Sequence, residues 1–284
     1  MKNDYLMKKE QAIFVWVEMN MKYILITGAN GGMGKETVDL FAKRGFRVLA
    51  LDRNACTPRE NVIPIQADVT DESSIAAAFD AVNAETQELC GIIHLAGIYM
   101  LDSLAEISPS GFERAFRVNL GGVFLSNRTF LPLLKSGSKI IMLTSELAVR
   151  DPLPFTGLYG ITKTALDQYA YSLRMELQLL GISVSVLRAG AVDTGMLGVS
   201  TRQLDAFCRN TKLYTCNAKR FKQIVDSVEA RRIPPAEIAE KLYQVFSTKN
   251  PKFAYSINRN PLLIMLDMLP KSARFWIIKK ILSA

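Results

Sequence analysis

The chain has 284 residues, of which 49% are hydrophobic and 22% charged, a composition typical of a globular protein. It contains a single histidine, His94, and four widely spaced cysteines without a CxxC pair. These counts disfavour a zinc site, a histidine-based catalytic triad and a disulfide framework. We therefore expect no metal ion.

The net charge of +8 is concentrated in two segments. Residues 195–232 hold eight basic and three acidic side chains, a net of +5, and residues 261–284 hold four basic and one acidic, a net of +3. Charge confined to one lobe and one tail favours an anionic substrate or a membrane surface over nucleic acid. A solvated basic surface without any partner is the alternative.

The ends of the chain differ from its middle. Residues 13–17 form an apolar run that is too short to span a bilayer and lacks a cleavage site for secretion. We therefore expect an N-terminal extension over residues 1–21 and a cytoplasmic protein. A dinucleotide-binding and catalytic domain is expected over residues 22–260, followed by an apolar tail over residues 261–284.

Short β-rich runs alternate with longer helical patterns from residue 22 onward. Gly45 and Gly181 stand where helix C-termini need a left-handed residue. The alternation predicts right-handed βαβ crossovers and a doubly wound parallel sheet of the Rossmann type, in the α/β class. The predicted strands are 23–27, 47–51, 62–66, 91–95, 139–144 and 183–188, and the predicted helices are 32–44, 71–88, 110–134 and 158–180.

A glycine-rich turn joins the first strand to the first helix, in the sequence Thr27-Gly-Ala-Asn-Gly-Gly-Met-Gly34. Such a turn lets the backbone approach a pyrophosphate closely and directs the helix N-terminus at its charge. Asp52 ends the second strand, where a carboxylate can bind ribose hydroxyls and favours NAD. Arg53 argues for NADP, because a guanidinium can pair with a 2′-phosphate. We expect NAD, with NADP as the alternative.

In these motifs the chain resembles the short-chain dehydrogenase/reductase family, in its short single-domain branch. The resemblance covers about residues 22–248 and its motifs stand in the family's order. They are the turn of residues 27–34, Asp68-Val69, His94-Leu-Ala96-Gly97, Asn119, Ser145, Tyr159-x-x-x-Lys163 and Ala189-Gly190 with Thr194.

The sequence departs from the family pattern at three places. His94 and the leucine after it replace two asparagines, and Ala189 replaces a proline. Ser145 precedes Tyr159 by fourteen residues instead of thirteen, so we expect a one-residue bulge between them, with Thr144 as the alternative hydroxyl. We interpret His94 as a buried histidine and not as a proton carrier.

The resemblance implies the catalytic residues Ser145, Tyr159, Lys163 and Asn119. Tyr159 and Lys163 are four residues apart on a predicted helix and so share a face. We expect the ammonium and a positive nicotinamide ring to lower the pKa of Tyr159, which would then exchange a proton with the substrate. Ser145 would bind the carbonyl oxygen, and Asn119 would anchor a water that links Lys163 to solvent.

The expected cofactor-binding residues follow from the same motifs. They are Thr27, Gly28, Asn30, Gly31, Gly32, Met33, Gly34, Asp52, Arg53, Asp68, Val69, Ala96, Gly97, Tyr159, Lys163, Gly190, Val192 and Thr194.

The remaining segments concern the substrate. Residues 195–232 are expected to form a small helical substrate lobe. Its apolar residues either line a substrate cleft or pack in a core, and they are Leu197, Val199, Leu204, Phe207, Leu213, Phe221 and Ile224. The tail either lies in a membrane interface, with Trp276 at headgroup depth, or caps the substrate cleft and a dimer edge. Proline and aspartate in the tail interrupt a clean amphipathic helix and favour the cap.

We therefore expect an oxidoreductase that interconverts an alcohol and a ketone or aldehyde, on a lipophilic substrate such as a steroid, a retinoid or a long-chain alcohol. Tails of this kind resemble those of family members that act on such compounds. We also expect a homo-oligomer. A non-catalytic nucleotide sensor or scaffold is the alternative, which the intact Ser145, Tyr159 and Lys163 disfavour. An epimerase or dehydratase would need a different base.

Overall fold

The computed structural model describes residues 21–228 and 232–283, and these contain one parallel sheet. Its strands are β1 (Lys22–Thr27), β2 (Phe46–Asp52), β3 (Val62–Gln66), β4 (Leu89–His94), β5 (Leu134–Ser145), β6 (Ser183–Ala189) and β7 (Ala254–Ile257). They lie in the order β3-β2-β1-β4-β5-β6-β7. The chain switches from one side of β1 to the other between β3 and β4, which opens a crevice at the carboxyl ends of β1 and β4. The predicted doubly wound sheet is confirmed.

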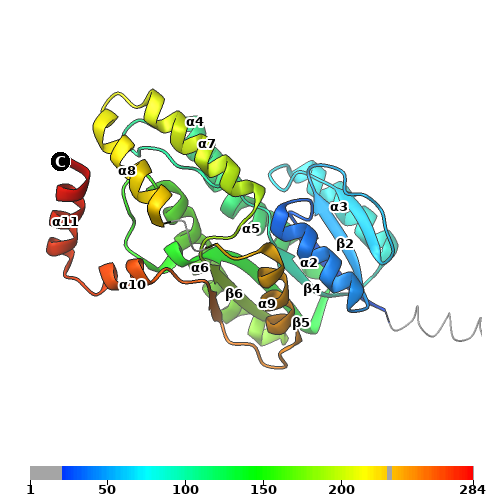
Figure 1. Ribbon diagram of the computed structural model, residues 1–284. Coiled ribbons are helices and arrows are strands. Elements are labelled where there is room, and N and C mark those ends of the chain that lie inside the picture. The colour runs from blue at the N-terminus through cyan, green and yellow to red at the C-terminus, as the bar shows by residue number, and fades with distance from the viewer. Residues whose placement is uncertain (1–20, 229–231, 284) are drawn as a thin grey trace, which may run out of the picture.

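Helices cover both faces of the sheet (Figure 1). The helices α2 (Gly32–Lys43) and α9 (Pro235–Ser247) bury apolar side chains against one face. The helices α3 (Glu72–Glu85), α5 (Gly122–Phe130) and α6 (Gly157–Leu177) cover the other. Because both faces are buried, the central strands are continuous apolar runs, which is why their positions could be predicted from sequence.

The helix predicted over residues 110–134 is present, but its winding changes along its length. The chain forms α4 (Pro109–Phe116), a π-helical turn (Arg117–Gly121), α5 and a 3-10 turn (Leu131–Leu133) before it enters β5. The π turn holds Asn119 in the interior, and Pro132 cannot continue the backbone hydrogen bonds of α5.

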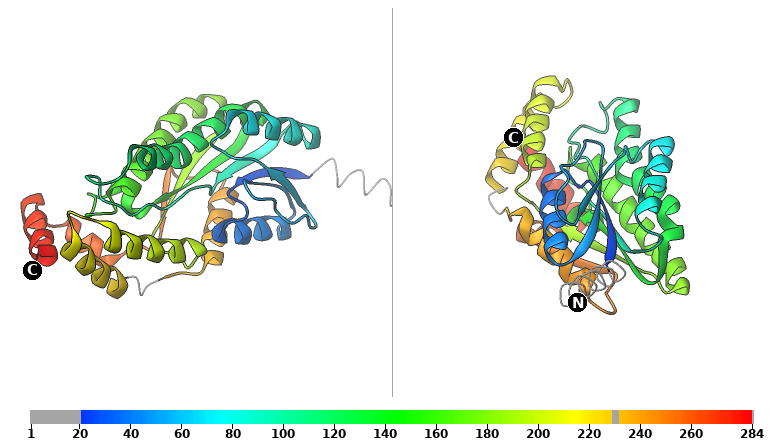
Figure 2. Two further views of the ribbon diagram at one scale, coloured as in Figure 1. Left: turned by 90° about the horizontal axis from the view of Figure 1, so that it is seen from above. Right: turned by 90° about the vertical axis from the view of Figure 1, so that its right-hand side faces the viewer.

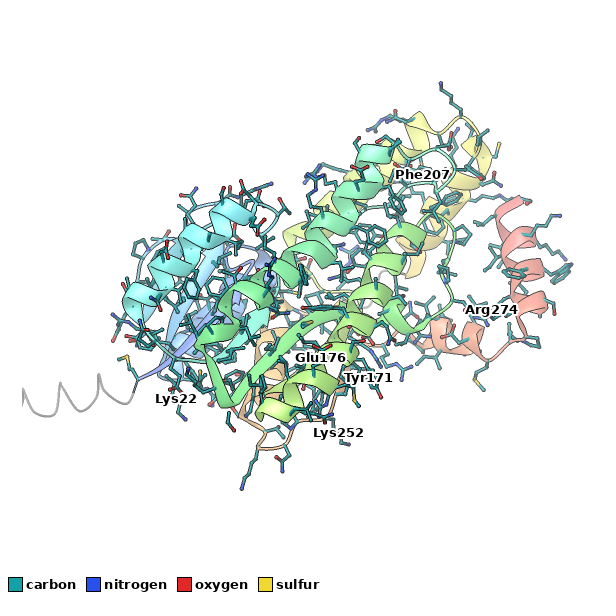
Figure 3. The ribbon with its side chains drawn as sticks, turned by 180° about the vertical axis from the view of Figure 1, so that it is seen from behind. Lys22, Tyr171, Glu176, Phe207, Lys252 and Arg274 are labelled. Carbon is teal, nitrogen blue, oxygen red and sulfur yellow. The ribbon has the colours of Figure 1, made fainter. Side chains whose placement is uncertain are left out.

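The lobe and the tail occupy one end of the molecule (Figure 2). The lobe contains α7 (Gly195–Asn210) and α8 (Thr215–Val228), and the tail contains α10 (Pro261–Asp267) and α11 (Lys271–Ser283). A separate apolar cluster around Phe155, Phe207 and Phe221 joins them. In Figure 3, Phe207 and Arg274 lie at this end and Lys22 at the other.

The predicted left-handed residues are confirmed at Gly45 and Gly181, with φ of 86° and 73°. The predicted N-terminal extension lies outside the described residues, except for its last one. Across the described ranges, no helix has the length and apolarity that a bilayer crossing requires.

Candidate active site

Tyr159 and Lys163 stand on one face of α6, as their spacing predicts. The Lys163 ammonium lies 5.8 Å from the centre of the Tyr159 ring and donates a 3.0 Å hydrogen bond to the Leu143 carbonyl of β5. The Tyr99 ring packs against the Tyr159 ring, with the two ring centres 4.8 Å apart. The Tyr159 phenol is thus fixed between a helix, a strand end and a second aromatic ring.

The electrostatics of this pair differ from our expectation. Burial raises the pKa of Tyr159 to about 12, and a hydrogen bond with Ser145 opposes the rise. Burial also lowers the pKa of Lys163 to about 8. The predicted lowering of the Tyr159 pKa by the ammonium is therefore wrong for the protein alone, because loss of hydration outweighs a charge that is directed at Leu143. Near neutral pH the phenol is a proton donor.

Ser145, and not Thr144, is the hydroxyl beside Tyr159. The Thr144 hydroxyl donates to Asp167, at 3.2 Å, and the same carboxylate is paired with Arg188 at 2.6 Å. Ser145 ends β5, and its hydroxyl accepts a 3.2 Å hydrogen bond from the Leu147 amide. The Ser145 hydrogen remains free to be donated toward the phenol or a substrate oxygen.

The extra residue between Ser145 and Tyr159 was predicted to produce a bulge. The segment contains a 3-10 turn over Glu146–Val149 and a left-handed Phe155, with φ of 66°. This conformation is costly for a bulky residue. The Phe155 ring packs against Phe207, Tyr214 and Phe221 of the lobe, and these contacts offset part of the conformational free energy.

Asn119 lies under the turn that follows β4. Its side-chain oxygen accepts from the Ile98 amide at 2.8 Å, and its amide nitrogen donates to the Ile98 carbonyl and to the Thr162 hydroxyl. These contacts use both amide hydrogens, so only the second lone pair of the oxygen could hold the water we expected. A Cβ on Gly97 would lie 3.2 Å from the Asn119 oxygen and 3.6 Å from the Lys163 nitrogen.

The glycine-rich turn fits a bound dinucleotide. Gly28 has φ of 71°, and a Cβ there would lie 2.5 Å from the Ala96 nitrogen. A Cβ on Gly34 would lie 2.0 Å from the Gly28 carbonyl oxygen. Gly31 precedes α2 without any side-chain cap among the described residues. The first amides of α2 are therefore available to a phosphate, and no Cβ obstructs the backbone.

Several of the other predicted cofactor residues border this turn. The Asp52 carboxylate accepts from the amides of Asn30 and Asn54, both at 3.0 Å, and the Arg53 side chain is exposed beside it. A Cβ on Gly32 would touch the Thr194 side chain at 3.0 Å.

Asp68 and Val69, which were expected beside the adenine, are both engaged in contacts within the protein. The Asp68 side chain accepts from the amide and the hydroxyl of Thr70, at 2.9 and 2.7 Å, and these bonds lower its pKa. Val69 packs against Gly122, where a Cβ would be 2.7 Å from its methyl carbon. Asp68 therefore stabilises the turn after β3. Its amide donates to the Ser74 hydroxyl and its carbonyl accepts from the Asp71 amide, so Val69 remains the group that can face a base.

A cavity of about 490 Å³ opens beside Ser145 and Tyr159. The strand ends contribute Ala189, Gly190 and Val192, and the turn contributes Met33. Of the residues predicted to line it, Phe221 and Ile224 do so, whereas Leu213 is 65% exposed and Leu204 and Phe207 are buried in the lobe. The prediction for Leu213 is wrong. The side chains of Leu197 and Val199 lie outside those described.

The tail also lines this cavity, in line with the expected cap over the substrate cleft, although its lining residues were not predicted one by one. Leu262, Leu263 and Leu266 of α10 line it, together with Ile277, Ile278, Ile281 and Leu282 of α11. The outer side of the tail is also apolar, with Phe275 and Trp276 at 72% and 62% exposure. The apolar composition of the tail was a signal for burial, although it did not say against what.

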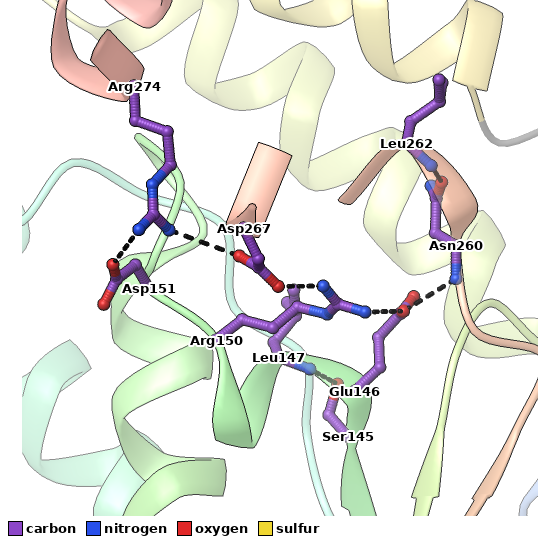
Figure 4. A network of polar contacts seen from close by, with 9 residues as sticks. All are labelled: Ser145, Glu146, Leu147, Arg150, Asp151, Asn260, Leu262, Asp267 and Arg274. Carbon is purple, nitrogen blue, oxygen red and sulfur yellow. Dashed lines mark hydrogen bonds and ion pairs between the residues drawn. The ribbon is translucent and has the colours of Figure 1, made fainter. Parts of the chain in front are cut away.

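A chain of ionic contacts fastens the tail to the segment after β5 (Figure 4). Arg150 pairs with Glu146 at 3.7 Å and with Asp267 of α10. Arg274 of α11 pairs with Asp267 at 3.3 Å and with Asp151 at 2.8 Å. Because Arg150 is nearly fully buried, its own contacts with Glu146 and Asp267 are screened less by solvent than the pair of Arg274 with the half-exposed Asp151, and they hold α10 over the cavity.

The family can now be stated from comparison with known proteins. The family described as short chain dehydrogenase matches residues 22–205. The chain belongs to the short-chain dehydrogenase/reductase family. It is an NAD(P)-dependent oxidoreductase, as the resemblance of its motifs implied.

Individual relatives cover most of the chain. A probable short-chain type dehydrogenase/reductase, VdlC, of Helicobacter pylori is 27% identical over 87% of this chain and 93% of that protein. The 3-ketodihydrosphingosine reductase of Bacteroides thetaiotaomicron is 25% identical over 89% of this chain and 93% of that protein. A short chain dehydrogenase structure from Francisella tularensis has a TM-score of 0.70 at 24% identity, covering 84% of this chain and 97% of that one.

His94 replaces an asparagine of the family and is buried, as we interpreted it. Its Nε2 lies 2.8 Å from Asn127 Oδ1, and burial lowers its pKa from 6.5 to about 4. The unfolded chain therefore binds a proton near pH 6.5 that the folded chain refuses until about pH 4. The free energy of unfolding should fall by up to about 3 kcal/mol as the pH drops through this window.

We expect His94→Asn to remove this acid-side loss of stability. Urea unfolding of each protein at pH 7 and at pH 4.5 gives two free energies of unfolding. Their difference is the loss of stability on the acid side. Carboxylates contribute equally to both proteins and cancel in the comparison. If the free energy of unfolding fell equally in the two proteins, His94 would either be protonated in the folded state already or not be the cause of the loss.

Proposed function

We propose that this chain interconverts an alcohol and a ketone or aldehyde on a lipophilic substrate, such as a steroid, a retinoid or a long-chain alcohol, and prefers NAD. The observation that carries the proposal is the apolar cavity of about 490 Å³ beside Ser145 and Tyr159. Its volume lies within the range of about 300–1,000 Å³ that ligand sites occupy. The 3-ketodihydrosphingosine reductase relative supports it, because that name denotes a lipophilic ketone.

Four residues would carry the chemistry. When bound, the nicotinamide cofactor supplies or accepts the hydride. In reduction the Tyr159 phenol gives its proton to the carbonyl oxygen, and in oxidation the phenolate takes it back. Ser145 donates a hydrogen bond to the same oxygen as charge develops there. Lys163 stabilises the phenolate and holds the cofactor ribose, and Asn119 keeps the turn at Gly97 and Ile98 in place.

The cofactor would lie along the carboxyl edge of the sheet. Gly32 and Met33 offer backbone amides to the pyrophosphate at the start of α2, whereas the Gly31 amide donates to the Gly28 carbonyl at 3.1 Å. Asp52 and Arg53 face the adenosine ribose. The remaining contacts would come from Thr27, Gly28, Asn30, Gly34, Asp68, Val69, Ala96, Gly97, Tyr159, Lys163, Gly190, Val192 and Thr194.

A panel of steroid, retinoid and aliphatic alcohols tests the proposed substrate class. We expect NADH formation with kcat/KM rising as the apolar part of the alcohol grows, because each buried methylene adds about 0.8 kcal/mol of transfer free energy. Equal kcat/KM for butanol and decanol would contradict a lipophilic substrate. Binding of NADH without turnover of any alcohol or ketone would favour the sensor alternative.

Asp52 should set the choice of nucleotide. Its carboxylate repels a 2′-phosphate and binds a free ribose hydroxyl, so Asp52→Ala should raise the ratio of kcat/KM with NADP to that with NAD by about tenfold or more. The measurement is steady-state kinetics with both cofactors on one alcohol.

Two variants control this experiment. Asp52→Asn removes the charge but keeps an acceptor for the Asn30 amide, so it separates repulsion from loosening of the turn. Arg53→Ala should change the ratio in the opposite direction. A wild-type protein that already prefers NADP would show that Arg53 dominates and that our assignment of NAD is wrong.

The tail and the assembly belong to the proposal as well. We infer from the lining residues that the tail caps the cavity, and peripheral membrane contact through its outer side remains the alternative. A homo-oligomer remains a prediction, which sedimentation velocity tests.

A further inference from the structure

Gln203 joins the lobe to the segment that follows β4. It lies half-buried on α7, one position before Leu204, which is buried in the lobe. Its side-chain nitrogen donates a 3.0 Å hydrogen bond to the Tyr99 carbonyl, and its side-chain oxygen accepts a 3.1 Å hydrogen bond from the Leu101 amide. One side-chain amide thus holds two backbone groups that lie 104 and 102 positions away in the sequence.

The segment of residues 98–101 belongs to no helix or strand, and side chains fix its backbone. Asn119 holds the start of the segment, because the amide and the carbonyl of Ile98 both bond to the Asn119 side chain. Gln203 holds the rest of the segment in the same way. Two side-chain amides, one from the π turn and one from the lobe, therefore set the path of this backbone.

The Tyr99 ring is the part of this segment that reaches the reacting groups. Its centre lies 4.8 Å from the centre of the Tyr159 ring, and both side chains line the cavity. The Lys163 ammonium is directed at the Leu143 carbonyl and not at the phenol. Contact with the Tyr99 ring and a hydrogen bond with Ser145 are two restraints on the phenol.

Proton transfer depends on the alignment of the phenol. A general acid must come within about 2.6–3.2 Å of the atom that it protonates. A displacement of about 1 Å lowers the rate of a positioned reaction by up to about a hundredfold. The backbone of α6 fixes only the start of the Tyr159 side chain, so contacts on the ring decide where the hydroxyl lies.

We infer that Gln203 is a positioning residue for the reaction: by holding the backbone at Tyr99, it keeps the Tyr99 ring against Tyr159 and the phenol directed at the substrate oxygen. Gln203 is absent from the described residues that line the cavity, so it acts through Tyr99 and not by contact with the substrate. The inference rests on the proposed function, in which Tyr159 is the proton carrier.

Gln203→Met tests the inference, because methionine keeps the length of the side chain but has no donor and only a weak acceptor. The measurement is the single-turnover rate of NADH formation at saturating NAD and alcohol. We expect it to fall about tenfold on butanol and decanol alike, since the phenol is displaced while the apolar wall is kept. The Kd of NADH should stay unchanged.

Gln203→Glu is a second variant, in case the methionine disturbs the lobe. It keeps the acceptor for the Leu101 amide and places a carboxylate oxygen against the Tyr99 carbonyl, so the rate should fall as in Gln203→Met. An unchanged rate in both variants would overturn the inference. A fall on decanol without a fall on butanol would also overturn it, because it would assign Gln203 to the apolar wall.

A double-mutant cycle shows whether Gln203 acts through Tyr99. Tyr99→Ala removes the ring, so adding Gln203→Met to it should lower the rate little further. If the two effects multiplied instead, Gln203 would act by another route and the inference would be wrong.

Glu106→Ala is the matched control for a loosened lobe. The Glu106 carboxylate accepts hydrogen bonds from the Thr211 hydroxyl at 2.6 Å and from the amides of Lys212 and Leu213 at 2.8 and 3.1 Å. It therefore also ties the lobe to the chain between β4 and α4. This variant should lower the melting temperature and leave the single-turnover rate nearly unchanged. An equal loss of rate would assign the effect to the lobe as a whole and overturn the inference.

A readout without turnover separates the inference from its premise. In protein labelled with fluorotyrosine and loaded with NADH, the fluorine NMR signal of Tyr159 is the one that Tyr159→Phe removes. Gln203→Met should move or broaden this signal as Tyr99→Ala does, and Glu106→Ala should leave it in place. An unmoved signal in Gln203→Met would overturn the inference. A moved signal in a protein that turns over no alcohol or ketone would support the hold of Gln203 on Tyr159 and overturn the proposed function.

Discussion

Tyr159→Phe should lower kcat by about a hundredfold or more, because it removes the group that exchanges a proton with the substrate oxygen and leaves the apolar ring in place. The affinity for NADH should stay nearly unchanged, since the phenol hydroxyl faces the substrate cavity. Stopped-flow turnover of an alcohol that the wild-type protein accepts measures the first quantity, and NADH fluorescence titration measures the second.

Tyr99→Phe is the matched control for this variant. Tyr99 packs its ring 4.8 Å from that of Tyr159 and lines the same cavity. Loss of its hydroxyl should lower kcat far less than loss of the Tyr159 hydroxyl. If Tyr159→Phe kept more than about a tenth of the wild-type rate, the proton carrier would have to be another group.

Removal of residues 261–284 should lower kcat/KM on a long-chain alcohol more than tenfold and lower the melting temperature. The deletion removes seven apolar side chains from the cavity wall and the partners of Arg150 and Asp151. The loss of Asp267 leaves the buried Arg150 with Glu146 alone, which is costly. Activity on a short alcohol should fall less, because a short alcohol needs Ser145 and Tyr159 but uses little of the apolar wall that the tail provides.

Liposomes distinguish the cap from a membrane anchor. If the tail only caps the cavity, the full-length protein should not co-sediment with anionic liposomes at low salt. A matched variant, Phe275→Ser with Trp276→Ser, changes the exposed side of α11 and should keep activity. Salt-sensitive binding to liposomes that this variant loses would show that the basic, aromatic outer side contacts a membrane.

The sequence by itself determined the arrangement of the nucleotide half of the molecule. A buried parallel strand is a run of apolar residues, and a turn that places backbone next to backbone requires glycine. Both can therefore be recognised in the local sequence. Gly28 and Gly34 were therefore predictable as close-contact positions. The spacing of Tyr159 and Lys163 likewise determined that both would share one helix face.

Other features depended on residues far apart in the chain. The short strand β7 (Ala254–Ile257) has too few residues for a pattern and exists because β6 offers it an edge. The π turn at Asn119 is set by contacts with Ile98 and Thr162, which no local periodicity records. The pKa of Tyr159 also depended on burial, which raises it in the protein alone, although the charge of its neighbour Lys163 had suggested a lower value.

Only the tertiary structure shows that the tail lines the cavity. The apolar runs after Pro261 predict burial in a membrane, at a dimer edge or in a cavity wall, and among these the sequence favours the cap only through the interrupting Asp267 and Pro270. Glu146 and Asn260 are 114 positions apart, and Arg150 and Asp267 are 117 apart, so their pairing appears only when β5 and α10 are brought together. Hydrophobicity is non-directional and is visible in composition, whereas the partner of a buried charge is fixed by geometry and is not.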